Sequence, residues 1–384
     1  MVAGTSVAAA AVAAVGAGGA PAQAASVRVV HPGESIQAAV DAAAPGDTVL
    51  VLPGTYRGSV QISKPRVTLR GTGAGITVLA PATTASDPQS TTGPANPATN
   101  PATNSAINPA TNPDTGNATS TSTSTSAVAC AAAGDGLCVT GADGVRVESL
   151  TVTGFAKYGI WATSADRLTV DHVRADANGQ YGIGQEKSIR SRFTSNEASG
   201  NGEAGLFVAN AVSEEGGATD TQGTEIRGNA LTGNHMGLVV RRLRRVTVDA
   251  NTISGNCAGV FLVGDENTPR AGEMTVTGNK VDANNAYCAA TARLPYVQGS
   301  GIVLTGVENT LVSGNEVTGN VGASPLSGGV VLFPSFTGKP DSGNTVRNNT
   351  LLHNGPADLA DRDHGTGNTF TANECQVSLP AGHC

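Results

Sequence analysis

The segments Gly237-Leu-Val-Val240, Val246-Thr-Val-Asp249, Asn251-Thr-Ile253 and Asn256 form one unit of a pattern that recurs along the chain. Successive units begin 22 to 42 residues apart, counted from one glycine to the next. The other glycines that begin units are Gly159, Gly182, Gly205, Gly259, Gly301 and Gly329. A period of about 22 residues that is lengthened by insertions indicates a solenoid of stacked units.

Three sets of apolar residues recur in each unit. The first set lies one and three residues after the glycine, as in Leu238 and Val240, and this alternation predicts a short strand with one buried face. The second set is Val170, Phe193, Ile226, Val248, Val276, Val312, Val346 and Phe370, and the third is Ala175, Ala198, Leu231, Ile253, Val281, Val317, Leu351 and Cys375. Three strands per unit around one axis predict an all-β fold, a single-stranded parallel β-helix of about ten turns spaced about 4.8 Å apart.

Two asparagine columns accompany the strands. One column is Asn196, Asn229, Asn251, Asn279, Asn315, Asn349 and Asn373, and the other is Asn178, Asn201, Asn234, Asn256, Asn284, Asn320 and Asn354. Asparagine tolerates the left-handed backbone of tight corners and bonds to backbone at turns. We therefore interpret the columns as structural ladders, in preference to the alternative that they bind a ligand.

The chain resembles the right-handed parallel β-helix superfamily, which includes pectate-lyase-like and NosD-like repeat proteins. The resemblance rests on these repeats and on the run Ser35-Ile-Gln-Ala-Ala-Val-Asp-Ala-Ala-Ala-Pro-Gly-Asp-Thr-Val-Leu-Val-Leu-Pro-Gly-Thr-Tyr56. It covers residues 27–80 and 130–384. The resemblance implies the fold but no single activity, because the superfamily contains lyases, hydrolases, epimerases and proteins without known chemistry.

The N-terminal part divides into two segments. Residues 1–25 are apolar and end in a small-x-small pattern, so we expect a signal-peptide-like segment cleaved near Ala24 or Ala25, although no basic residue precedes Arg28. Glycines and Pro21 interrupt the run, which disfavours a membrane span. Residues 26–81 are expected to form the N-terminal cap and first turns, with a capping helix at 34–44.

Residues 82–129 differ in composition from the rest. They repeat Asn-Pro-Ala-Thr, alternate Ser with Thr and have no apolar periodicity, so we predict a disordered insert. A binding or glycosylated linker is the alternative. The β-helix repeats are expected to occupy residues 130–384. The net charge of −7 disfavours nucleic acid and anionic membranes as partners.

The six cysteines occur without a Cys-x-x-Cys motif. Behind a signal sequence, an even count indicates disulfides and a secreted, extracellular protein. Proximity in the sequence favours the pairs Cys130–Cys138, Cys257–Cys288 and Cys375–Cys384. Free buried thiols are the alternative.

The resemblance implies that the outer face of the strand after each glycine carries substrate. Six of the 13 aromatic residues fall on this predicted face: Tyr158, Trp161, Tyr181, Phe207, Phe261 and Phe333. Sugar rings stack on aromatic faces, so these residues, with Glu186, are candidate polysaccharide-binding residues. The alternative is that insertions fold over the aromatic face and bury it.

Glu203 and His235 are expected to occupy one column in adjacent turns, about 5 Å apart. A carboxylate–imidazole pair suits general acid–base chemistry. With Tyr181, and with Arg241 as a ligand for a substrate carboxylate, the pair would fit a lyase or epimerase that acts on a uronate-containing glycan. Ordinary turn charges are the alternative. The run Arg241–Arg245 would either attract an acidic polysaccharide or form a solvated corner.

No cofactor is evident. Calcium is the metal ion that the resemblance leaves open, although the aspartates are not clustered as in pectate lyases, and no ligand set supports copper. We therefore carry two hypotheses: an exported protein that binds or processes a polysaccharide on the first-strand face, or a non-catalytic structural or interaction protein. The sequence does not decide whether the protein is an enzyme, nor its oligomeric state.

Overall fold

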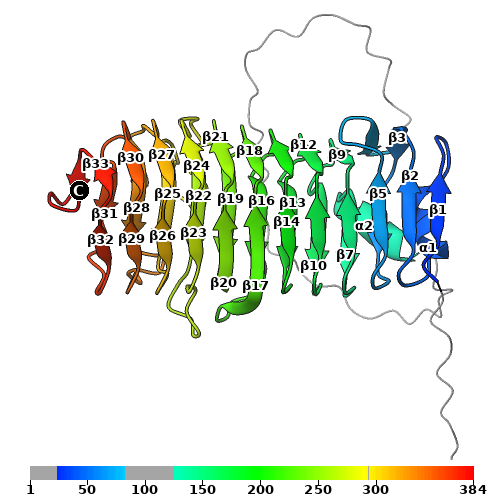
Figure 1. The fold of residues 1–384 in the computed structure, drawn as a ribbon, viewed down its shortest axis with the longest axis horizontal. Helices are drawn as coiled ribbons and strands as arrows, with labels where there is room; N and C mark the ends of the chain where they lie inside the picture. The colour runs from blue at the N-terminus through cyan, green and yellow to red at the C-terminus, as the bar shows by residue number, and fades with distance from the viewer. Residues whose placement is uncertain (1–23, 83–124, 293) are drawn as a thin grey trace, which may run out of the picture.

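A computed structural model describes residues 24–82, 125–292 and 294–384. These residues form one elongated β-helix with the N-terminal strands at one end and the C-terminal strands at the other (Figure 1). Three parallel sheets of 12, 11 and 11 strands run along it, slightly more than the expected ten turns. Each sheet takes one strand from almost every turn.

The strands are short and are distributed in a regular order. Sheet A contains β1 (Val27–Val30), β2 (Thr48–Val51), β5 (Thr68–Gly71), β8 (Arg146–Glu148), β11 (Thr169–Asp171), β14 (Arg192–Thr194), β17 (Thr219–Arg227), β20 (Leu243–Asp249), β23 (Thr275–Thr277), β26 (Leu311–Ser313), β29 (Thr345–Arg347) and β32 (Thr369–Thr371). Sheet B contains β3 (Gly54–Arg57), β6 (Thr77–Ala80), β9 (Thr151–Thr153), β12 (Arg174–Asp176), β15 (Glu197–Ser199), β18 (Ala230–Thr232), β21 (Thr252–Ser254), β24 (Lys280–Asp282), β27 (Glu316–Thr318), β30 (Thr350–Leu352) and β33 (Glu374–Cys375). Sheet C contains β4 (Val60–Ile62), β7 (Leu137–Thr140), β10 (Ile160–Thr163), β13 (Tyr181–Glu186), β16 (Ala204–Ala209), β19 (Met236–Arg241), β22 (Ala258–Val263), β25 (Ser300–Thr305), β28 (Gly328–Phe333), β31 (Leu359–Asp361) and β34 (Ser378–Leu379).

The register confirms the predicted apolar columns. Val248 of β20 pairs with Val276 of β23, and Leu238 of β19 pairs with Val260 of β22. All four side chains are fully buried in the axial core. The strand after each glycine is therefore the sheet C strand, whose alternate residues point outward.

The asparagine columns are hydrogen-bonded ladders. Asn251 Nδ2 donates to Asn279 Oδ1 at 2.9 Å and to the Ile226 carbonyl at 2.9 Å, and the other members repeat this arrangement. One ladder ends at Asp358, whose Oδ1 accepts from Asn354 N and Nδ2. These contacts satisfy buried backbone and amide groups at the corners, which is the structural role expected from the sequence.

Two helices are present in the described part of the chain. Helix α1 (Ile36–Ala42) has the expected place near the N-terminal end; the Ser35 hydroxyl caps it, and Ile36 and Val40 are buried. Helix α2 (Thr125–Ala133) was not predicted, and it begins inside the segment expected to be disordered. Its alanine-rich sequence favours a helix, and the Cys130–Cys138 disulfide ties it to β7. The remainder of that segment, and most of the signal-like segment, lie outside the described residues.

The three expected disulfides are all present. Cys130 pairs with Cys138, Cys257 with Cys288 and Cys375 with Cys384. The second joins the start of β22 to the long insertion before β25, and the third ties the C-terminus to β33. Neither helix in the described ranges is long and apolar enough to cross a membrane.

Candidate functional site

The outer face of sheet C carries a second apolar cluster, separate from the axial core. Tyr158, Tyr181, Phe207 and Phe261 are each less than 9% exposed. The cluster also contains residues from the long insertions: Val212, Leu294, Val297 and Leu326. Insertions therefore cover most of the aromatic face, as the alternative expectation had it, and among the six aromatic residues only Trp161 and Phe333 are half-buried.

Four rings near the N-terminal end of this face form a stack. The ring centroids of Tyr158 and Trp161 are 4.4 Å apart, those of Tyr158 and Tyr181 4.9 Å, and those of Tyr181 and Phe207 4.3 Å. Gly184 provides the space for the indole, because a Cβ at this position would lie 2.6 Å from the Trp161 ring. The stack thus presents one partly exposed aromatic edge, at Trp161.

Charged side chains surround the stack. The Lys157 ammonium lies 4.4 Å from the centroid of the Tyr158 ring, and the Tyr181 hydroxyl hydrogen-bonds to the Glu203 carboxylate. Burial, followed by the negative charge of neighbouring carboxylates, raises the pKa of both tyrosines, so both phenols are protonated at neutral pH. The stack can therefore donate hydrogen bonds but cannot supply a phenolate.

Asp135 belongs to this site and was missed in the sequence. Its Oδ1 accepts from the Tyr158 backbone N–H at 3.3 Å, and its side chain is buried. Burial raises the pKa of Asp135, while the Lys157 charge opposes this shift. The signal was present, since Gly136 precedes Gly159 by one period of 23 residues and places Asp135 in the Tyr158 column.

The backbone places the predicted pair Glu203 and His235 in adjacent turns. Met236 N, which follows His235, donates to the Glu203 carbonyl at 2.9 Å, so the two residues do lie in adjacent turns. Burial alone lowers the pKa of His235, and its buried Nε2 has no hydrogen-bond partner among the described residues. A neighbouring carboxylate would raise this pKa. Burial is the only cause that acts on the imidazole pKa, which favours the neutral ring at neutral pH, and the sharing of a proton between Glu203 and His235 stays a prediction.

Glu186 and Arg241 hold an insertion rather than line an open groove. Glu186 Oε2 accepts from Val212 N at 2.8 Å, and Arg241 Nη1 donates to the Ala211 and Val212 carbonyls at 3.1 and 3.3 Å. The predicted column is correct, since both residues pair with Ala209 between them. The two side chains fasten the segment after β16 across the outer face.

The other arginines of the basic run form ion pairs with acidic side chains of the protein. Arg242 forms ion pairs with Asp265 and Glu215, and Arg245 pairs with Asp220. Arg244 contacts Glu273 at 2.5 Å and Glu308 at 2.8 Å. Arg242 and Arg244 are thus held by acidic side chains at a largely buried corner, whereas the Arg245 side chain is 57% exposed.

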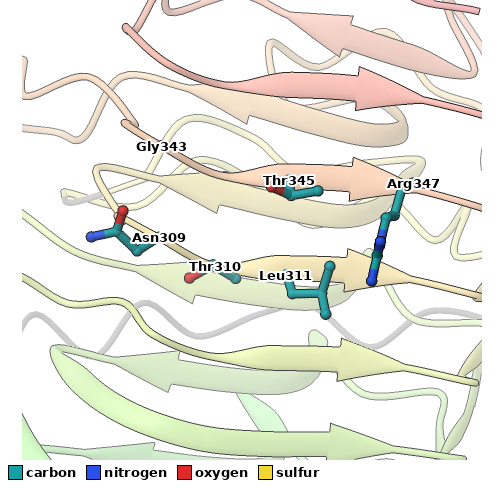
Figure 2. A pocket seen from close by; sticks show the side chains of 6 residues that line it. All are labelled: Asn309, Thr310, Leu311, Gly343, Thr345 and Arg347. Carbon is teal, nitrogen blue, oxygen red and sulfur yellow. The ribbon is translucent and has the colours of Figure 1, made fainter.

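Sheet A carries shallow depressions away from the ring stack. A shallow depression of about 290 Å³ lies on sheet A, lined by Asn309, Thr310, Leu311, Gly343, Thr345 and Arg347. Figure 2 shows the Arg347 side chain extending from β29 toward β26, beside Leu311. This depression contains none of the predicted site residues. Within the described ranges, no three His, Cys, Asp or Glu side chains are arranged to hold a metal ion.

Comparisons with known proteins agree with this architecture. The family model described as "Right handed beta helix region" matches residues 116–272 and 219–382, which together exceed half of the chain. No curated protein matches the sequence.

Several solved structures share the fold. The A-modules of the mannuronan C-5 epimerases AlgE6 and AlgE4 from Azotobacter vinelandii each superpose with a TM-score of 0.54, at 18% and 16% identity, over 90% of this chain and of theirs. DFA-IIIase from Arthrobacter chlorophenolicus A6, without its lid, superposes with a TM-score of 0.52 at 13% identity, over 85% of this chain and 84% of its own. At these identities the likeness shows the fold alone. The three parallel sheets of this chain and the extent of the family match together show that the chain belongs to the right-handed β-helix family.

Proposed function

We propose that this protein binds a polysaccharide at the ring stack on the outer face of sheet C. The observation that carries the proposal is the partly exposed Trp161, whose ring centroid lies 4.4 Å from that of Tyr158 and whose indole occupies the space left by Gly184. A fixed aromatic edge provides an apolar surface for a sugar ring without the entropic cost of ordering it on binding.

The polar groups beside the stack suit a sugar. Lys157, Gln180 and Glu203 are half-buried beside it in the chain, so they offer both donors and acceptors for hydroxyl groups. A site for small molecules commonly combines aromatic walls with a few fixed polar groups. The mannuronan C-5 epimerases that share the fold are named for action on a polysaccharide, which supports the same class of ligand here.

Lyase or epimerase chemistry is the finer part of the proposal. Glu203 holds the Tyr181 hydroxyl, and His235 is neutral with an unpartnered Nε2 in the described structure. A neutral imidazole can accept a proton from a carbon next to a uronate carboxyl. Removing that proton is the step that lyases and epimerases share, with elimination or reprotonation following.

A non-catalytic interaction protein is the second candidate. It is favoured by the burial of Phe207 and Phe261 beneath insertions, because a covered face cannot accommodate a long polymer. Export is proposed for either function, since three disulfides are typical of oxidising compartments. Sequencing the N-terminus of protein recovered from the medium would test export.

A glycan screen tests the proposed function. Wild-type protein is assayed against acidic and neutral polysaccharides for binding and for the near-ultraviolet absorbance of unsaturated uronic products. Trp161→Ala should abolish binding, whereas Tyr287→Ala, which removes a 64% exposed ring from an insertion, should not. Product that disappears with His235→Ala would support a lyase. Absence of binding to every glycan would overturn the proposal and favour the interaction protein.

A further inference from the structure

Arg362 lies on the outer side of the C-terminal end of sheet C. It follows β31, and its backbone N donates to the Leu332 carbonyl at 2.9 Å. Asp361 is in register with the inward-facing Leu332, so Arg362 is the neighbour of Phe333, which belongs to the outer apolar cluster. The guanidinium is held in place, because Nη2 donates to the Ser327 carbonyl at 2.9 Å and Nη1 donates to the Pro325 carbonyl.

This arginine is half-buried, yet it has no acidic partner in the described part of the chain. Other buried or half-buried arginines differ: Arg242 pairs with Asp265, Arg244 with Glu308 at 2.8 Å, and Arg270 with Glu308 at 3.8 Å. Burial lowers the pKa of Arg362, and no carboxylate opposes that shift. Placing a cation in a desolvated position without a counter-charge is costly.

A structural role alone does not account for the charge. The two carbonyls, of Pro325 and Ser327, need two donors, which a neutral amide could supply without the desolvation of a cation. The guanidinium has five N–H donors, and carboxylates bind to it through two parallel hydrogen bonds. Phe333 beside it is half-buried and offers an apolar surface.

We propose that Arg362 and Phe333 form a subsite for the carboxylate of an acidic sugar, with the guanidinium binding the carboxylate and the phenyl ring contacting the sugar ring. This inference rests on the proposed function and specifies the ligand as a uronate-containing polysaccharide. Seven strand-to-strand steps separate β31 from β10 in sheet C, a distance of about 34 Å at about 4.8 Å per step. The subsite is therefore distinct from the ring stack at Trp161.

The test uses a short acidic ligand and its uncharged counterpart. Binding of a galacturonate trimer and of its methyl ester is measured by calorimetry with the wild type, Arg362→Gln, Trp161→Ala and the control Arg347→Gln. Arg347 is an exposed arginine on sheet A with no acidic partner in the described structure. Because a trimer is too short to span both sites, we expect Arg362→Gln to weaken acid binding at the Arg362 subsite alone by about 10- to 100-fold, the size of a lost charge-assisted contact, and Arg347→Gln to leave binding at both sites unchanged.

The two proposals fail in different ways. Equal affinity of wild type and Arg362→Gln for the acid, with binding lost in Trp161→Ala, would overturn the subsite and leave the proposed function standing. Absence of binding by the wild type to any glycan would overturn both. If circular dichroism shows that Arg362→Gln does not fold, the test uses the wild type alone. Equal affinity of the wild type for the acid and the ester would then overturn the subsite.

Discussion

Asp341 provides the most direct test of how a buried carboxyl group limits the stability of this β-helix. The side chain is fully buried; its Oδ1 accepts from Val307 N at 2.7 Å, and its carboxyl contacts that of Asp363. Burial, together with the neighbouring carboxyl, raises the pKa of Asp341 from 3.8 to about 9. The perturbation that we propose is Asp341→Asn, which cannot ionise but keeps an oxygen for the Val307 N–H.

The sign of the pH dependence follows from proton uptake on folding. Because the folded pKa of Asp341 is raised, its favourable contribution is fully present below about pH 4 and is lost as the pH rises through about 9. Each pH unit in this window costs about 1.4 kcal/mol, so the cost at pH 8 reaches at most about 6 kcal/mol. The asparagine variant carries no such cost.

Urea unfolding of wild type and Asp341→Asn between pH 4 and pH 8 measures the difference in unfolding free energy. We expect the difference to be small at pH 4 and to grow to several kcal/mol in favour of the variant at pH 8. Asp341→Ala is the control for packing, because it leaves the Val307 N–H without its acceptor and should be less stable than Asp341→Asn at every pH. A difference between Asp341→Asn and wild type that does not change with pH would refute the reasoning.

Three further predictions concern the ladder, a disulfide and the ring stack. Asn251→Ala removes both hydrogen bonds donated by its amide and should lower the unfolding free energy by about 2–3 kcal/mol; an unchanged urea midpoint would contradict the ladder's role. Replacing Cys257 and Cys288 by serine opens a loop with a sequence separation of 31 and should lower the free energy of urea unfolding by about 3–4 kcal/mol; an unchanged unfolding free energy would contradict the disulfide's role. Gly184→Val would place Cβ 2.6 Å from Trp161 and displace the indole, so glycan binding should fall; unaltered Trp161 fluorescence would argue against this contact.

The axial core and the ladders could be predicted because a solenoid converts sequence period into spatial contact. Val248 and Val276 lie one turn apart in the chain and are direct neighbours in sheet A. Asn251 and Asn279 also lie one turn apart in the chain, and their side chains are hydrogen-bonded at the corner. Each such contact depends on two equivalent positions in adjacent units, so reading the repeat is enough to place it.

The candidate site depended on information that the repeat does not contain. Asp135 is in the Tyr158 column, but its contact with the Tyr158 backbone N–H depends on how the chain packs after helix α2. The lowered pKa of His235 follows from burial by its surroundings. Two adjacent positions in a column do not by themselves determine how deeply a side chain is buried.

The sequence by itself determined the three sheets, the strand register and the asparagine ladders, because these contacts join equivalent positions one period apart. Only the tertiary structure decided which outward residues are covered. Glu186 and Arg241 reach the insertion after β16, and Arg270 reaches Ser342, 72 residues away. Such contacts join non-equivalent positions, and their partners are fixed by the paths of insertions that have no period, which is why the burial of the aromatic face and the isolated charge of Arg362 emerge only in the folded molecule.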